Sequence, residues 1–163
     1  NAEFVKGGKL PGLMGGPGFH TGGIYPDGTD GWTGRLMWWK NGGILGYMYH
    51  AEQPNIYGEN FYWDDGVNGQ TYFQKGQWNR VEIRYVMNTP GINDGNLQAW
   101  YNGQLVLDRK DVMYREPGGE SVGIDNLLFS TFYGGGDSSW APSTNQYLYF
   151  DNFVVSKLPI THY

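Results

Sequence analysis

Four residues that could do chemistry, Thr33, Arg35, Tyr47 and Tyr49, alternate along two segments that a glycine-rich turn separates. The segments "WTGRLMWWK" and "ILGYMYHA" flank "NGG", a pattern that predicts a β-hairpin. Residues of equal parity on a strand point to the same side of the sheet. If the turn centres on Asn41, Arg35 lies opposite Tyr47 and Thr33 lies opposite Tyr49. This register gathers a hydroxyl, a guanidinium and two phenols into one patch, whereas a bulge in the turn would separate them.

This patch has the groups needed for β-elimination on a uronic acid. Removing the proton at C5 builds enolate-like charge on the C6 carboxylate, which the planar Arg35 guanidinium can stabilise. A base must take that proton and an acid must protonate the leaving O4. A tyrosine whose pKa is lowered by a nearby cation can serve both steps, and we favour Tyr49 over Tyr47. The same pattern also fits residues that only pack, because strand tyrosines are mostly packing residues.

Further strands must support this hairpin. The segment 79–88 alternates apolar and polar residues, and 97–109 contains Asn102–Gly103 between two apolar runs, which predicts a second hairpin. The segments 126–134 and 146–158 are the predicted closing strands. The Gly- and Pro-rich segment 1–31 is expected to be an ordered loop around short extended pieces, and 52–70 and 110–125 are expected to be loops. No window predicts an amphipathic helix.

The composition supports an all-β fold. The chain has 163 residues, which suits one domain over 1–163, and it combines 27 glycines with 17% aromatic residues. We expect a β-jelly roll or sandwich of two antiparallel sheets, with a concave groove in which an extended polymer can lie. The chain has no cysteine, so no disulfide framework or thiolate metal site is expected.

Charge and hydropathy limit the classes of binding partner that this chain can have. A formal net charge of −5 argues against a general nucleic-acid binder, which needs a basic footprint. An anionic substrate must therefore meet a local cluster of Lys and Arg. No apolar run approaches the roughly 20 residues of a membrane span. The chain begins at Asn1 without an initiator Met, so we expect a processed, secreted protein, acting as a monomer.

An ordered series of motifs over nearly the whole chain resembles the polysaccharide lyase family 14 domain, which includes alginate and glucuronan lyases. The motifs are "GGKLPGL", "WTGRLMW", "YMYH", "NTPG", "DGNLQAWYNG", "FSTFYGG", "SWAP" and "FDNFVVS". The resemblance implies a β-jelly roll, a lyase that cuts uronic-acid chains, and no required cofactor. It also implies functional roles for Lys9, Thr33, Arg35, Tyr47 and Tyr49. Thr33 stands where the family usually has Ser, which keeps the hydroxyl.

Lys9 enters this set only through the resemblance, since a Lys in a glycine-rich loop is usually solvated. It could bind the substrate carboxylate and lower a tyrosine pKa, or it could transfer the proton itself. Trp39, His50 and Gln53 are candidate substrate-binding residues at the edge of the patch, although a regular strand points His50 away from Tyr49.

Other chemistries leave weaker signals. Asp151 in "FDNF" is a candidate ligand for a structural Ca²⁺, and a hydrogen-bonded strand-edge Asp explains it equally well. A hydrolase needs two carboxylates across the scissile bond, and the strand-associated acids Glu82, Asp108 and Asp151 form no paired motif. A non-catalytic carbohydrate-binding module remains an alternative, supported by the tryptophans. A glycoside hydrolase on the same scaffold is the other.

Overall fold

The computed structural model describes residues 3–160, which form strands joined by loops and two short 3-10 turns. The strands are β1 (Gly7–Gly15), β2 (Trp32–Trp39), β3 (Ile44–Tyr49), β4 (Glu59–Tyr62), β5 (Val81–Val86), β6 (Gly95–Tyr101), β7 (Gln104–Val112), β8 (Asn126–Leu128) and β9 (Phe132–Tyr133). The 3-10 turns are η1 (Lys40–Gly42) and η2 (Ser138–Trp140). Neither turn, nor any other part of the described chain, forms a helix long and apolar enough to cross a membrane.

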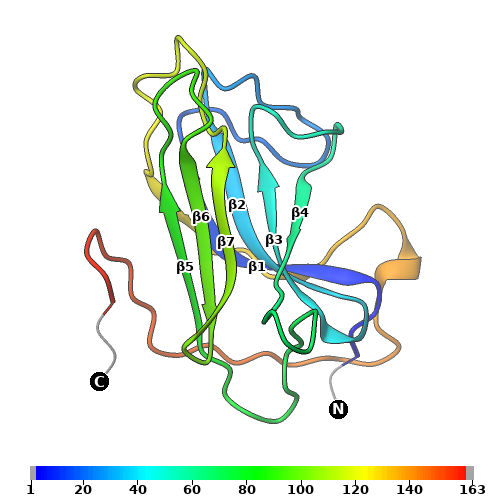
Figure 1. The fold of residues 1–163 in the computed structure, drawn as a ribbon. Helices are drawn as coiled ribbons and strands as arrows, with labels where there is room; N and C mark the ends of the chain where they lie inside the picture. The colour runs from blue at the N-terminus through cyan, green and yellow to red at the C-terminus, as the bar shows by residue number, and fades with distance from the viewer. Residues whose placement is uncertain (1–2, 161–163) are drawn as a thin grey trace.

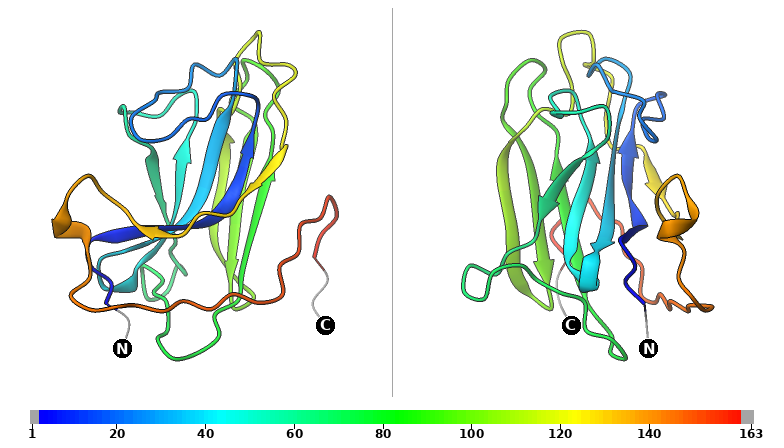
Figure 2. Two further views of the ribbon diagram at one scale, coloured as in Figure 1. Left: turned by 180° about the vertical axis from the view of Figure 1, so that it is seen from behind. Right: turned by 90° about the vertical axis from the view of Figure 1, so that its right-hand side faces the viewer.

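The strands build two antiparallel sheets that pack as a sandwich (Figure 1). The larger sheet has the order β4-β3-β2-β1-β8, with β9 also paired to β1, and the smaller has the order β5-β6-β7. Figure 2 shows the two layers edge-on in its right-hand view, with the green strands on one side and the blue and cyan strands on the other. The predicted all-β sandwich of two antiparallel sheets is confirmed.

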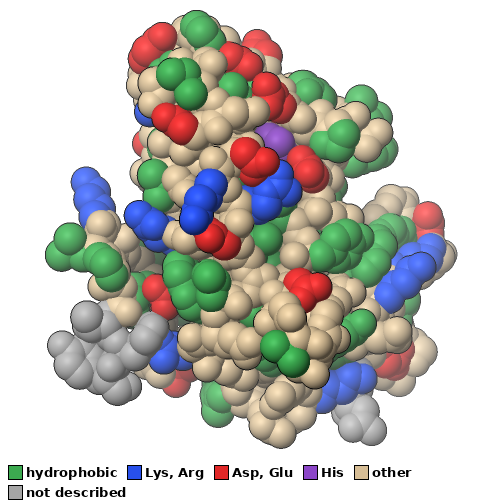
Figure 3. All heavy atoms as spheres, in the orientation of Figure 1, with side chains coloured by type: hydrophobic (Ala, Val, Ile, Leu, Met, Phe, Trp, Pro, Cys, Tyr) green, Lys and Arg blue, Asp and Glu red, His purple; other side chains and the backbone are tan. Residues whose placement is uncertain are grey.

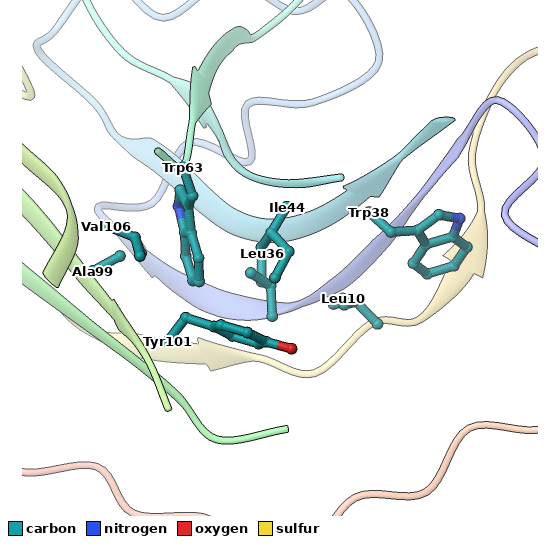
Figure 4. Close-up of a cluster of buried hydrophobic side chains, with 8 residues drawn as sticks. All are labelled: Leu10, Leu36, Trp38, Ile44, Trp63, Ala99, Tyr101 and Val106. Atoms are coloured by element: carbon teal, nitrogen blue, oxygen red, sulfur yellow. The ribbon is translucent and has the colours of Figure 1, made fainter. Parts of the chain in front are cut away.

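The core between the sheets explains which residues of each strand face inward. Leu36 and Ile44 from the large sheet meet Tyr101 from the small one, and Figure 4 shows these side chains converging. Burial of such apolar area is the main driving force for the fold. Because side chains alternate along a strand, the neighbours Arg35 and Met37 must point to the other side of the large sheet.

The first hairpin has the predicted register. Arg35 pairs with Tyr47 and Thr33 pairs with Tyr49, without an irregularity between β2 and β3. The turn is formed by η1, in which Asn41 has a left-handed φ of 61°. The second predicted hairpin is also present, because Asn102 and Gly103 both have positive φ between β6 and β7.

The expectation of a loop for residues 1–31 is wrong for its central part. β1 is a nine-residue strand inside the large sheet, paired with β2 on one side and with β8 and β9 on the other. Pro11 lacks an N–H for the ladder, and the pairing with β2 is irregular between Lys9 and Gly12, as a strand proline requires. A Cβ at Gly12 would lie 1.9 Å from the Gly34 carbonyl oxygen. Pro and Gly here form a bulge in a strand and do not end it.

Three further segments differ from expectation. β4 lies within the predicted loop 52–70, and β7 continues into the predicted loop 110–125 as far as Val112. The predicted closing strand 146–158 forms no strand, and the chain runs there as an extended, exposed segment in which Leu158 is 76% exposed. Figure 1 shows this orange-to-red segment crossing below the sandwich. Apolar alternation alone does not make a strand where no ladder partner is available.

The outer face of the small sheet carries charges of both signs. Arg84 donates to Gln98, Gln98 donates to Asp108, and Lys110 lies 3.1 Å from the Asp108 carboxylate. Figure 3 shows Lys and Arg side chains interleaved with Asp and Glu over β5, β6 and β7. This face is therefore neutralised and offers no basic surface to a polyanion.

Candidate functional site

The predicted site lies on the side of the large sheet that faces away from the core. Lys9 pairs with Met37, so its side chain shares this side with Arg35 and, across the next ladder, with Tyr47. Phe132 pairs with Lys9 from the other side. Three neighbouring strands and β9 thus bring together residues that are up to 123 positions apart in the chain.

Lys9 lies on β1, just before the bulge, and not in the loop that the sequence suggested. Its ammonium nitrogen is 4.6 Å from the centroid of the Tyr47 ring. Burial, and next the charge of Arg35, lowers the pKa of Lys9 from 10.5 to about 8. A substantial fraction of Lys9 is therefore neutral in mildly alkaline solution and able to accept a proton.

Arg35 is buried, with 5% of its surface exposed, and is held by polar and aromatic contacts. Its Nη2 donates to Thr21 Oγ1 at 3.0 Å, and its guanidinium carbon lies 6.0 Å from the rings of Phe19 and Phe132. Burial lowers its pKa. Among residues 3–160, no carboxylate forms an ion pair with Arg35 or Lys9. Two cations therefore lie side by side, and the described part of the chain supplies no ion-pair partner for either of them.

Tyr47 and Tyr49 form an edge-to-face pair, with ring centroids 5.6 Å apart and hydroxyl oxygens 3.5 Å apart. The Gly58 N–H donates to the Tyr47 hydroxyl, and the Gly23 N–H donates to the Tyr49 hydroxyl, each at 3.1 Å. Burial, followed by the hydrogen bond with Tyr49, raises the pKa of Tyr47 above its usual value of 10. The Arg35 charge lowers this pKa, as expected of a neighbouring cation, but desolvation and the contact with Tyr49 outweigh it, so the net shift is upward.

Thr33 attaches the loop between β1 and β2 to the site. Its hydroxyl, on a residue only 1% exposed, donates to the His20 carbonyl oxygen at 2.6 Å. The His20 Nε2 lies 2.7 Å from the Asp30 carboxylate, which fixes the ring within the same loop. Together with the contacts made by Thr21 and Gly23, these bonds hold the loop over Arg35 and Tyr49.

The structure does not bring His50 and Gln53 into this cluster. His50 packs against Phe61 of the core, and its Nε2 lies 2.8 Å from Glu59. The buried Gln53 side chain accepts the His50 N–H and donates to the Asn55 carbonyl, so it holds the turn after β3. Trp39 does share the side of Arg35, at the far end of β2, where its ring lies 6.2 Å from that of Trp140.

The weak metal candidate has no supporting ligand cluster. Asp151 is exposed, and its carboxylate accepts the N–H of Asn152. Within the described residues, no group of three or more His, Cys, Asp or Glu side chains is placed to hold an ion. A surface hollow of about 320 Å³ lies elsewhere, lined by residues that include Gln70, Tyr72 and Tyr101, and contains none of the predicted site residues.

Sequence reasoning missed the residues that hold the reactive groups. Thr21 and Gly23 come from the loop that follows β1, Gly58 comes from the turn before β4, and Phe132 comes from β9. Three of these contacts use a backbone N–H or a hydroxyl, and such contacts leave no pattern in one sequence. Phe132 belongs to the motif "FSTFYGG", in which the family resemblance implies no functional residue.

Solved structures similar to this chain are alginate lyases. Alginate lyase Aly36B is 31% identical, with a TM-score of 0.69 over 85% of this chain and 57% of that one. A marine PL-14 alginate lyase from Aplysia kurodai is 27% identical, with a TM-score of 0.69 over 86% of this chain and 59% of that one. Alginate lyase vAL-1 from Chlorella virus is 30% identical, with a TM-score of 0.66 over 81% of this chain and 57% of that one.

Mutants of Aly36B are known in complex with an alginate trisaccharide and an alginate tetrasaccharide. The chain spans 57–59% of the length of these related chains. A comparison with curated proteins gave no significant match. The family model described as Polysaccharide lyase 14 matches residues 1–153, nearly the whole chain. The chain therefore belongs to the polysaccharide lyase 14 family.

Proposed function

We propose that the protein cleaves alginate, or a closely related uronate polymer, by β-elimination at the cluster formed by Lys9, Arg35, Tyr47 and Tyr49. The observation that carries this proposal is the pair of cations, Lys9 and Arg35, that share one face of the sheet without a carboxylate partner in the described residues. Buried charges are normally paired, because desolvation makes an unpaired one costly. A substrate carboxylate would supply the missing anion.

The reaction class follows from what surrounds the cations. Elimination breaks the C5–H and C4–O4 bonds, forms a C4–C5 double bond, and places developing negative charge on the C6 carboxylate. Arg35 presents two parallel N–H donors that match this group and remains charged throughout, so we assign it to the carboxylate.

Lys9 is the group best suited to take the C5 proton. A general base must be unprotonated at the working pH, and the lowered pKa of Lys9, about 8, favours its unprotonated amine, while the raised pKa of Tyr47 disfavours its phenolate. The Tyr49 side chain is only 2% exposed, and such burial disfavours the phenolate that the preference for Tyr49 requires. Protonated Lys9 can then return its proton to O4.

The two tyrosines act as positioning groups in this scheme. Tyr47 supports Lys9 through its ring, and the two hydroxyls offer hydrogen bonds on the substrate side of the sheet. Thr33, whose hydroxyl is already bonded to the His20 carbonyl, fixes the neighbouring loop. Because a polymeric uronate does not cross a membrane unaided, the proposal also implies that the protein acts outside the cell.

The test is incubation with polymannuronate, polyguluronate and glucuronan, followed by ultraviolet absorbance of the unsaturated product and by product masses. The expected result is rising absorbance on at least one polymer, and products without an added water. Products that gain water would identify a hydrolase. Binding of the polymers without any cleavage would identify a binding module, and both outcomes would refute the proposed elimination.

The matched variants are Lys9→Met and Lys40→Met. Lys40 lies in η1, at the exposed end of the same hairpin, and contributes nothing to the cluster. We expect Lys9→Met to abolish the absorbance change and Lys40→Met to retain it. Equal rates in the two variants would remove Lys9 from the reaction.

A further inference from the structure

A second group of aromatic and basic side chains lies where β1 begins and β2 ends, on the same side of the sheet as the cluster. Trp39 and Trp140 lie with ring centroids 6.2 Å apart and planes inclined by 58°. The Lys6 ammonium is 5.3 Å from the centroid of the Trp140 ring and donates to the Ser139 hydroxyl. All three residues of this group, Lys6, Trp39 and Trp140, are partly exposed.

The fold positions this group in line with the catalytic cluster. Trp39 follows Arg35 by four residues on β2 and points to the same side, about 13 Å further along the strand. Lys9 pairs with Met37 between these two points, and Gly7 pairs with Trp39. Figure 2 shows η2, in orange, beside the first residues of β1. The span between Arg35 and Trp39 exceeds one pyranose ring, so the sugar whose carboxylate binds Arg35 is not the one that stacks on Trp39.

Two consecutive glycines allow the loop after β9 to approach both groups. A Cβ at Gly134 would lie 2.9 Å from the Lys9 side-chain nitrogen, and a Cβ at Gly135 would lie 2.0 Å from the Trp140 indole nitrogen. The Trp140 ring is thus held against the Gly135 backbone on one side. Adjacent residues of this loop, Gly134 and Gly135, therefore lie against Lys9 and Trp140 respectively.

We propose that Lys6, Trp39 and Trp140 form a remote sugar subsite that binds a uronate residue of the polymer away from the bond that is cleaved. The indole rings offer apolar area to the carbon face of a pyranose, and the ammonium of Lys6 offers a partner to its carboxylate. Asp137 also lies near Lys6, and its own pKa is held low by Ser139 and, to a smaller extent, by Lys6. This acid limits the positive charge, so the subsite depends on stacking as well as charge.

The inference rests on the proposed function, because the subsite is defined relative to the cleaved bond. Its specific consequence is a dependence on chain length. Oligouronates long enough to reach Trp140 gain binding there, whereas the shortest cleavable oligomers do not reach it.

The experiment compares Trp140→Ala and Lys6→Gln with the wild type on alginate oligomers of increasing length. The matched control is Trp78→Ala, since Trp78 is an exposed tryptophan in the β4–β5 connection, with 71% of its surface accessible. For long oligomers we expect kcat/KM to fall about tenfold in Trp140→Ala, as for loss of one anchoring side chain, with kcat little changed. For the shortest cleavable oligomers, wild type and variant should agree.

An equal loss at every length, or no loss at any length, would overturn the subsite. Calorimetric titration of the wild type and Trp140→Ala with a long alginate oligomer tests the inference separately from catalysis. Weaker binding in the variant supports the subsite, even if no polymer is cleaved. A lack of cleavage would refute only the proposed elimination. Equal binding in both proteins, or no binding by the wild type, refutes the subsite. Thermal unfolding of each variant establishes whether it is folded. If Trp140→Ala does not fold, the same measurements on Lys6→Gln test the subsite.

Discussion

Replacing Lys9 by Met should make the protein more stable at neutral pH while removing its activity. Lys9 has a pKa of about 8 in the folded chain against 10.5 for an ordinary lysine, because its ammonium is desolvated beside Arg35. At about 1.36 kcal/mol per pKa unit, the charged form costs the fold at most about 3–4 kcal/mol. Solvent reaches part of the Lys9 side chain, which reduces the expected cost to about 1–2 kcal/mol. Met keeps the unbranched length without the charge.

The stability gained by Lys9→Met must decrease as pH rises. Below pH 8 the lysine is protonated in both the folded and the unfolded chain, so the cost is present in full. Between pH 8 and 10.5 the unfolded chain binds a proton that the folded chain does not, so the wild type becomes more stable relative to the variant as pH rises. Above that window the lysine is neutral in both states and the cost is absent.

The assay is urea unfolding of the wild type, Lys9→Met and Lys40→Met, analysed by linear extrapolation at pH 7 and pH 9.5. We expect Lys9→Met to be the more stable protein at pH 7, and its advantage to fall to less than half at pH 9.5. The exposed control should show no comparable gain. A gain that is the same at both pH values would come from packing of the methionine, and a loss of stability would refute the argument that burial disfavours the charged lysine.

Three other outcomes follow from the same geometry. As the proposed base must be neutral, kcat/KM should rise with pH through about 8 and level off above it, and a rise only above pH 10 would indicate a tyrosine base instead. Thr21→Val should lower kcat/KM by roughly three- to tenfold, because the Arg35 Nη2 loses its acceptor, and Thr21→Ser should restore it; equal rates in all three proteins would contradict the role of this bond. Gly134→Ala should lower activity by roughly ten- to hundredfold with little loss of stability, since its methyl group would displace the Lys9 side chain. Gly136→Ala, which meets nothing within 4 Å, is the control, and equal rates in the two alanine variants would refute the displacement.

Much of the site could be predicted from the sequence because its centre is local. Thr33, Arg35, Tyr47 and Tyr49 lie on one hairpin, and a two-residue period with a short turn fixes which side chains share a face. Lys9 required the family resemblance, because Pro and Gly around it are typical of a loop. The structure shows that they form a bulge inside a central strand.

Properties that depend on distant parts of the chain were decided only by the tertiary structure. The pKa of Lys9 and of Tyr47 follows from how deeply each is buried, and burial comes from segments far apart in sequence. The 146–158 segment alternates like a strand, yet it has no ladder partner in the described structure. Strand period and turn chemistry are properties of neighbouring residues, and the sequence determined those. Desolvation, ladder partners and the absence, among residues 3–160, of a carboxylate paired with the two cations depend on the whole fold, so only the tertiary structure decided them.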